Sequence, residues 1–302
     1  MIHLYEKVPK TEDCVYGIRE ITNENPFENG PCVVTLIAVA DHLKEINGSL
    51  RLVANMVNPN IDTTVDPDRR ILGLGYGKYD EKDCTLSQRY PYSEDLEEFI
   101  NKYITPLLTK NGKKIDVYEA MKKVRNITFL TYCNGDTNYL RLENKMREVL
   151  TEYGYTKEEL DLIMCQICIA TITSHNMKLH DNKMVMFNFG DIYDKNYEDN
   201  FDLRCKISSN IPFDDDRIKF VNYGSYISCF AKGDDDHSLY KYMKYDKRFV
   251  SLISTVLNTS LDNAIVNKDS DVIIPITYEK VGSALEKVKQ DFDEEFVRNR
   301  KH

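Results

Sequence analysis

The 302-residue chain has no tryptophan, no long run of basic residues and no apolar window long enough to span a bilayer. Its formal net charge is −9, and the lysines and arginines are scattered among acidic residues. This charge pattern disfavours binding to nucleic-acid backbones and to anionic membrane surfaces. The first residues, Met1 to Lys7, lack a cationic segment followed by a long apolar core. We therefore expect no signal peptide, no nucleic-acid partner and no membrane partner.

What the chain does contain is typical of a folded protein. Hydrophobic residues make up 42% of it, and no low-complexity tract interrupts them, so the chain has enough apolar surface for a sizeable core. No internal repeat is visible. We expect a single α/β domain over residues 1–302, with residues 191–217, which show little periodicity, as an inserted loop.

Eight cysteines are spread along the chain, and several lie inside apolar runs. Scattered, buried thiols are typical of reduced cytosolic proteins rather than of a disulfide framework. We therefore expect a cytoplasmic protein.

Strands alternate with helices through the first half of the chain. The strongest strand is Ile127–Tyr132, and an apolar stripe from Tyr139 to Tyr153 then recurs at helical spacing. The other expected elements are strands at 32–39 and 70–76, helices at 41–57, 93–106 and 115–124, a loop at 78–92 and a turn at 111–112.

The second half is predicted with more alternatives. Thr156 and Glu159 form a capping box before an apolar run at 160–171, which favours a helix, although the β-branched end of the run also suits a buried strand. Further elements are expected as strands at 184–189 and 272–276, a strand or hairpin at 218–230, a helix at 238–265 broken near Asn258, and a charged helix at 278–298 packed on the outside. Such alternation predicts a three-layer α/β fold with a mostly parallel sheet flanked by helices and Ile127–Tyr132 near its centre.

The turn after that strand carries a candidate nucleophile. Cys133 lies between a strand and a helix start, within Thr131-Tyr132-Cys133-Asn134-Gly135. This small–x–nucleophile–x–small pattern resembles the nucleophile elbow of α/β-hydrolases, with Cys in place of Ser and Thr in place of the first Gly. By element order the resemblance covers residues 31–153. It implies an α/β-hydrolase-like fold and an acyl hydrolase or acyltransferase acting on an acyl or other small-molecule substrate.

The resemblance also implies an acid after a later strand and a histidine after the last one. In one assignment Cys133 is the nucleophile, Asp191 the acid and His237 the base, with the Asn134 N–H in the oxyanion hole. In the other, residues 233–236 form the acid loop and 272–276 is the strand before the base. No histidine then follows until His302, which implies a hydrolase-like protein without a working triad.

Two other functional classes stay open. A catalytically inactive scaffold of this fold would bind a protein partner or a small molecule. Alternatively, Gly73, Gly75 and Gly77 follow a strand and suit the approach of a nucleotide or adenosyl group.

Clusters of potential metal ligands have simpler explanations. Cys165 and Cys168 precede His175 and His180 at a spacing unlike a zinc finger, and helix packing accounts for them. The aspartate triplets 214–216 and 234–236 lack the alternating ligands of a calcium loop and are expected to be exposed turns. We predict no metal and no cofactor.

The location of the site follows from the fold class. Whatever the activity, we expect the site at the carboxyl ends of the parallel strands, under the loops 78–92 and 191–217. The residues predicted to converge there are Tyr76, Gly77, Cys133, Asn134 and Asp191.

Overall fold

The computed structural model describes residues 1–12, 14, 17–36, 42–57, 69–88, 90–172, 186–191, 219–223, 226–231, 247–268 and 270, with single positions 283, 287 and 290. The strands are β1 Ile2–Lys7, β2 Ile18–Glu20, β3 Cys32–Leu36, β4 Arg70–Asp80, β5 Thr85–Gln88, β6 Thr109–Lys110, β7 Lys113–Lys114, β8 Ile127–Tyr132, β9 Cys168–Ile172, β10 Met186–Asp191, β11 Lys219–Tyr223 and β12 Tyr226–Ala231. The helices are η1 Pro26–Glu28, α1 Leu43–Val57, α2 Ser93–Phe99, η2 Ile100–Ile104, α3 Thr105–Leu108, α4 Val117–Val124, α5 Gly135–Glu152, α6 Lys157–Met164 and α9 Lys247–Lys268.

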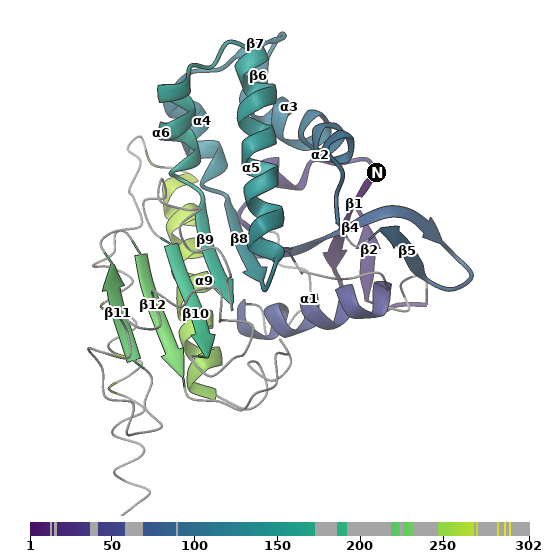
Figure 1. The fold of residues 1–302 in the computed structure, drawn as a ribbon, viewed down its shortest axis with the longest axis vertical. Coiled ribbons are helices and arrows are strands. Elements are labelled where there is room, and N and C mark those ends of the chain that lie inside the picture. The colour runs from purple at the N-terminus through teal and green to yellow at the C-terminus, as the bar shows by residue number, and fades with distance from the viewer. Residues whose placement is uncertain are drawn as a thin grey trace, which may run out of the picture.

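One large mixed sheet organises the described part of the chain (Figure 1). Its order is β11-β12-β10-β9-β8-β3-β4-β1-β2, with β5 paired to β4. The neighbouring strands from β12 through β10, β9, β8 and β3 to β4 run parallel, and the strands outside this block pair antiparallel. The predicted mostly parallel sheet is therefore confirmed.

Helices cover both faces of the sheet and complete three layers (Figure 1). One core cluster joins α1 and α9 to the sheet, and the other joins α2 to α6 to the opposite face. The residues of β8 from Ile127 to Thr131 are all buried, because a parallel strand between two helical layers has no solvent-facing side. β8 lies at the middle of the sheet, as its apolar composition predicted.

The structure corrects the prediction of one helix over residues 160–171, because a helix and a strand share this run. The capping box of Thr156 and Glu159 begins α6, but this helix ends at Met164 instead of continuing to residue 171. Residues Cys168–Ile172 form β9, which pairs with β8, so the buried-strand alternative holds there. The β-branched end of this run gains a full set of backbone hydrogen bonds in the sheet, and this tertiary pairing outweighs the local helical spacing.

The prediction of a loop at 78–92 is also wrong. β4 extends to Asp80 and turns into β5, so this segment begins as a β-hairpin. The sequence analysis did not predict the two N-terminal strands. β1 pairs with β4 on the side away from β3, and β2 pairs with β1.

The helix expected at 238–265 is not broken near Asn258. α9 continues through this position to Lys268, and the Asn258 carboxamide donates to the carbonyls of Met56 and Ser254 instead of interrupting the helix. The predicted strand at 272–276 lies outside the described residues, and of the predicted inserted loop at 191–217 only Asp191, which ends β10, is described. Of the predicted helix at 278–298 only positions 283, 287 and 290 are described.

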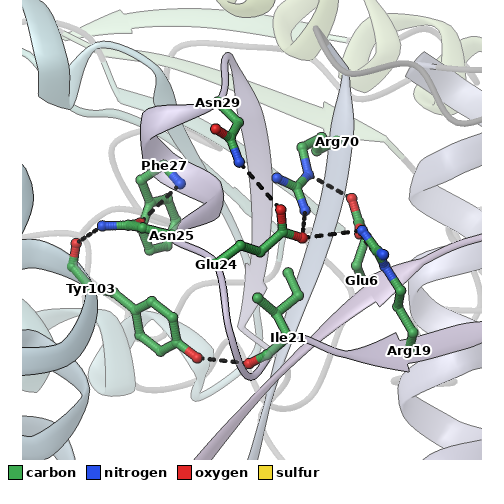
Figure 2. Close-up of polar contacts among 9 residues, drawn as sticks. All are labelled: Glu6, Arg19, Ile21, Glu24, Asn25, Phe27, Asn29, Arg70 and Tyr103. Carbon is green, nitrogen blue, oxygen red and sulfur yellow. Dashed lines mark hydrogen bonds and ion pairs between the residues drawn. The ribbon is translucent and has the colours of Figure 1, made fainter.

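A network of ion pairs ties the N-terminal strands to β4 (Figure 2). The Glu6 carboxylate accepts hydrogen bonds from Arg70 Nε at 2.5 Å and from Arg19 Nη2 at 2.6 Å. Glu24 accepts from the same two guanidinium groups at 3.0 and 3.1 Å, which closes a ring of two acids and two bases. Burial by itself lowers the pKa of Arg70, but the bonds to Glu6 and Glu24 outweigh this effect and leave the pKa raised.

Within this network the buried pair should contribute most to stability. The side chains of Glu6 and Arg70 are only 1% and 5% exposed, whereas that of Glu24 is 39% exposed. We expect Glu6→Gln to lower the free energy of unfolding by about 3 kcal/mol, because it leaves a buried guanidinium short of a countercharge. Urea unfolding of the purified protein measures this loss.

Glu24→Gln is the matched control, since it removes the same charge from an exposed position. Its expected cost is below about 1 kcal/mol. Equal losses for the two variants would contradict the assignment of the stabilisation to the buried pair.

Candidate functional site

The turn between β8 and α5 has an unusual backbone at Cys133. Its φ is +53°, and only Cys84 and Asn111 share a positive φ among the non-glycine residues that the structure describes. This left-handed region is unfavourable for a residue with a side chain. The Cys133 N–H donates to the Ile172 carbonyl at 2.9 Å, which holds the turn against the end of β9. The thiol is therefore held on a sharp turn and is half-buried.

Gly135, the second residue after Cys133, allows α5 to begin very close to β3. A Cβ atom placed on Gly135 would lie 2.0 Å from the Leu36 carbonyl oxygen, which is far inside van der Waals contact. A residue with any side chain would push the helix away from the strand. The glycine of the elbow-like pattern therefore has a steric reason in this structure.

The turn also lies where the chain reverses its direction of strand addition. After β3 the chain adds β4 on one side, and it later returns to place β8 on the other side. In open parallel sheets ligands bind outside the carboxyl ends of the strands at such a switch point. Here that point lies between Leu36, at the end of β3, and Cys133.

Asn134 forms the N-cap of α5 and is exposed. Its side chain makes no cap hydrogen bond with the helix. The N–H groups of the first turn thus stay directed toward the carboxyl edge of the sheet, where the helix dipole favours negative charge.

The other proposed triad residues are only partly described. Asp191 is the last residue of β10, two strands from β8, and the register aligns Tyr132 with Ile172 and Ile172 with Phe189. Two inter-strand spacings put the Cys133 and Asp191 backbones about 10 Å apart at the same edge of the sheet. His237 lies outside the described residues, so the proposed triad stays a prediction.

Tyr76 and Gly77 lie on the other side of this edge, in β4. Tyr76 is buried, and burial raises the pKa of its hydroxyl. Gly77 has a φ of +91°, and its carbonyl accepts a hydrogen bond from His3 Nε2 at 2.8 Å.

The glycines proposed for nucleotide binding are packed inside β4. A Cβ on Gly73 would meet Leu50 at 2.9 Å, and one on Gly75 would meet Leu86 at 2.7 Å. These glycines therefore allow close packing of α1 and β5 on the strand, and this geometry gives no support to a phosphate-binding loop.

Behind the turn at Cys133, the interface between α5 and β8 contains buried polar residues to which the sequence analysis gave no role. The Thr131 hydroxyl and the Asn138 Nδ2 have no hydrogen-bond partner in the part of the chain that the structure describes. An unpaired buried polar group costs about 1–3 kcal/mol. The sequence could have indicated the burial of Asn138, because this residue lies three positions after Gly135 and next to Tyr139, on the apolar stripe of α5.

One level further from the edge, the same interface contains an aromatic contact and a buried hydroxyl that has a hydrogen-bond partner. The rings of Phe129 and Tyr139 lie 4.7 Å apart, and the Tyr139 hydroxyl donates to Glu143 at 2.8 Å. Burial, followed by the nearby Glu143 carboxylate, raises the pKa of Tyr139 well above its ordinary value. The polar residues behind the elbow thus contrast with a tight aromatic contact directly below them.

Metal ligands do not gather anywhere in the described ranges. Cys165 caps the end of α6 and Cys168 begins β9, so the two thiols do not share a helix face as the sequence analysis assumed. Among the helices that the structure describes, none has the length and apolarity to cross a membrane.

No protein-family model matches the chain, and no curated protein sequence matches it either.

The Gly135 contact leads to a direct test of the geometry of the turn between β8 and α5. We expect Gly135→Ala to lower the free energy of unfolding by about 3 kcal/mol, since the added methyl group must displace the Leu36 backbone or α5. Urea unfolding at matched protein concentration measures the change.

Gly48→Ala serves as the control, because a Cβ at Gly48 in α1 meets nothing within 4 Å. This variant should gain roughly 0.5–1 kcal/mol from the higher helix propensity of alanine. A neutral Gly135→Ala would show that α5 is not held at the distance described.

Proposed function

We propose that the protein is an acyl hydrolase or acyltransferase of the α/β-hydrolase type, with Cys133 as its nucleophile. The observation that carries this proposal is the left-handed backbone of Cys133 between the central strand and α5, with Gly135 packed on Leu36. A nucleophile elbow needs this strained strand-to-helix turn to expose its nucleophile above the sheet.

The order of the strands supports the same function. The resemblance requires an acid and then a histidine after later strands of the sheet, and β9, β10 and β12 follow β8 in space in the same order as in the chain. Asp191 ends β10, and His237 follows the end of β12 at Ala231 by six residues in the sequence. An imidazole hydrogen-bonded on both sides can bridge a gap of the order expected between Cys133 and Asp191.

In the proposed first half-reaction, His237 accepts the thiol proton of Cys133 while the sulfur attacks the acyl carbon. The carbonyl π electrons move onto the oxygen, and the Asn134 N–H and the start of α5 stabilise the oxyanion. When the oxyanion collapses, the bond to the leaving group breaks and the imidazolium protonates that group. Asp191 orients the ring throughout.

In the second half-reaction, a water molecule or an acceptor alcohol gives its proton to His237 and attacks the thioester. The carbon–sulfur bond then breaks, and the proton returns to the thiolate. Atoms and charge balance over the cycle, with no cofactor consumed.

Turnover of p-nitrophenyl acetate tests this proposal. We expect Cys133→Ala, Asp191→Asn and His237→Gln each to lower kcat/KM, by at least about 1,000-fold for Cys133→Ala, because these residues act as one unit. The rates are measured by following the absorbance of the released p-nitrophenol.

Cys84→Ala is a close control, because Cys84 also has a left-handed backbone, with a φ of +54°, in the turn between β4 and β5. It should leave turnover unchanged. If Cys133→Ala and the wild type behave alike, the protein is better explained as a non-catalytic scaffold that binds a protein or a small molecule.

A further inference from the structure

We propose that Asn138 is a positioning residue for the Cys133 nucleophile, with a buried amide that stabilises negative charge at the elbow, and that Thr131 completes this polar layer. The inference rests on the proposed function, since it assigns a role in the reaction of Cys133. It concerns residues behind the turn, which do not contact the substrate.

The first reason is the position of Asn138 on α5. Asn138 lies one turn after Asn134, and its N–H donates to the Asn134 carbonyl at 3.2 Å. It shares a helix face with Gly135 and Tyr139, and this face packs on β3 and β8. Because a helical side chain leans toward the N-terminus, the Asn138 carboxamide covers the turn that contains Asn134 and Gly135.

The second reason is that this amide is buried without an acceptor. Asn138 is 3% exposed, and its Nδ2 has no hydrogen-bond partner in the part of the chain that the structure describes. An amide N–H that has no acceptor leaves a positive potential around it in a low-dielectric interior. That potential adds to the N-terminal dipole of α5, where the thiolate and the oxyanion would form.

Thr131 lies on the same side of the sheet, two residues before the nucleophile. Strand alternation puts its side chain on the same face as Phe129, whose ring makes an edge-to-face contact with Tyr139 of α5. Thr131 is 1% exposed, and its hydroxyl is also without a partner among the described residues. In the sheet register it pairs with Thr171 of β9, another buried threonine.

A purely structural interface would not keep these groups. Apolar residues of the same shape would avoid the cost of desolvating them, as Phe129 does one level below. Folded proteins leave few buried polar groups unsatisfied, and a catalytic role is one of the explanations for such a group.

The one acidic residue in the first turn of α5 is Asp136, which is buried and whose Oδ1 accepts from Thr137 Oγ1 at 3.4 Å.

The rate of alkylation of Cys133 by iodoacetamide as a function of pH tests this inference. The modified Cys133 peptide is quantified by mass spectrometry, so that the other cysteines do not interfere. Cys32 is an internal reference, since burial raises its pKa to about 12 and it should stay unmodified. We expect Asn138→Leu to slow alkylation at pH 7 by about tenfold and to move the midpoint of the pH profile upward.

Asn138→Asp tests whether the amide acts on Cys133 through its electrostatic potential. It keeps the shape of the side chain but replaces the donor with a group that can carry negative charge, so alkylation should be slower still. Thr131→Val, which is nearly isosteric, should slow it by about threefold. Asn144→Asp puts the same charge on the exposed face of α5 and should stay within twofold of the wild type.

Stability separates positioning from a structural role. Because Asn138→Leu and Thr131→Val remove unpaired buried groups, both should unfold at the same urea concentration as the wild type or at a higher one. Slower alkylation at undiminished stability supports the proposal. Unchanged alkylation, or slower alkylation with a parallel loss of stability, would overturn it.

Failure of this inference and failure of the proposed function give different results. If ester turnover does not depend on Cys133, the hydrolase proposal fails, while the alkylation series still tests whether Asn138 controls the thiol. If turnover depends on Cys133 and Asn138→Leu alkylates like the wild type, the hydrolase proposal stands and the role of Asn138 is wrong.

Discussion

The close contact between Gly135 and the Leu36 carbonyl sets the geometry on which the candidate site depends. It brings the first turn of α5 against β3, and the turn after β8 must therefore be sharp. Cys133 takes up this sharp turn with a left-handed backbone, and its N–H is held by β9. Because β8 lies at the middle of the sheet, the strain at this turn is supported by packed strands on both sides.

Two groups of buried polar residues in the sheet differ in their hydrogen-bond partners. Near the amino end of β4 the buried charges of Glu6 and Arg70 are paired within a closed ring of ion pairs. Near the carboxyl ends the Thr131 hydroxyl and the Asn138 amide are buried without partners in the described residues. A paired charge network thus lies near the amino end of β4, and buried polar atoms without a described partner lie near the carboxyl end of β8.

The side chains around Cys133 suggest why a thiol suits this turn. A helix N-terminus and buried dipoles stabilise a negative charge most effectively when water is kept away from one side of it. Half-burial of Cys133 and the polar layer behind it supply such surroundings. The hypothesis of a cysteine nucleophile thus rests on the backbone of the turn and on what lies beneath it, and not on the short sequence pattern alone.

Local signals in the sequence determined the elements that depend on near neighbours. The run Ile127–Tyr132, the capping box at Thr156 and the Asn111-Gly112 turn were predicted correctly, because burial pattern, side-chain caps and turn residues act within a few positions. For the run that forms β9 the sequence favoured a helix and left a buried strand as the alternative, since a short apolar run does not reveal whether it pairs with a distant strand. The tertiary structure alone decided the strand order, the left-handed turn at Cys133 and the burial of Asn138 behind it. These features arise from pairing and packing between residues far apart in the chain, which no local pattern encodes.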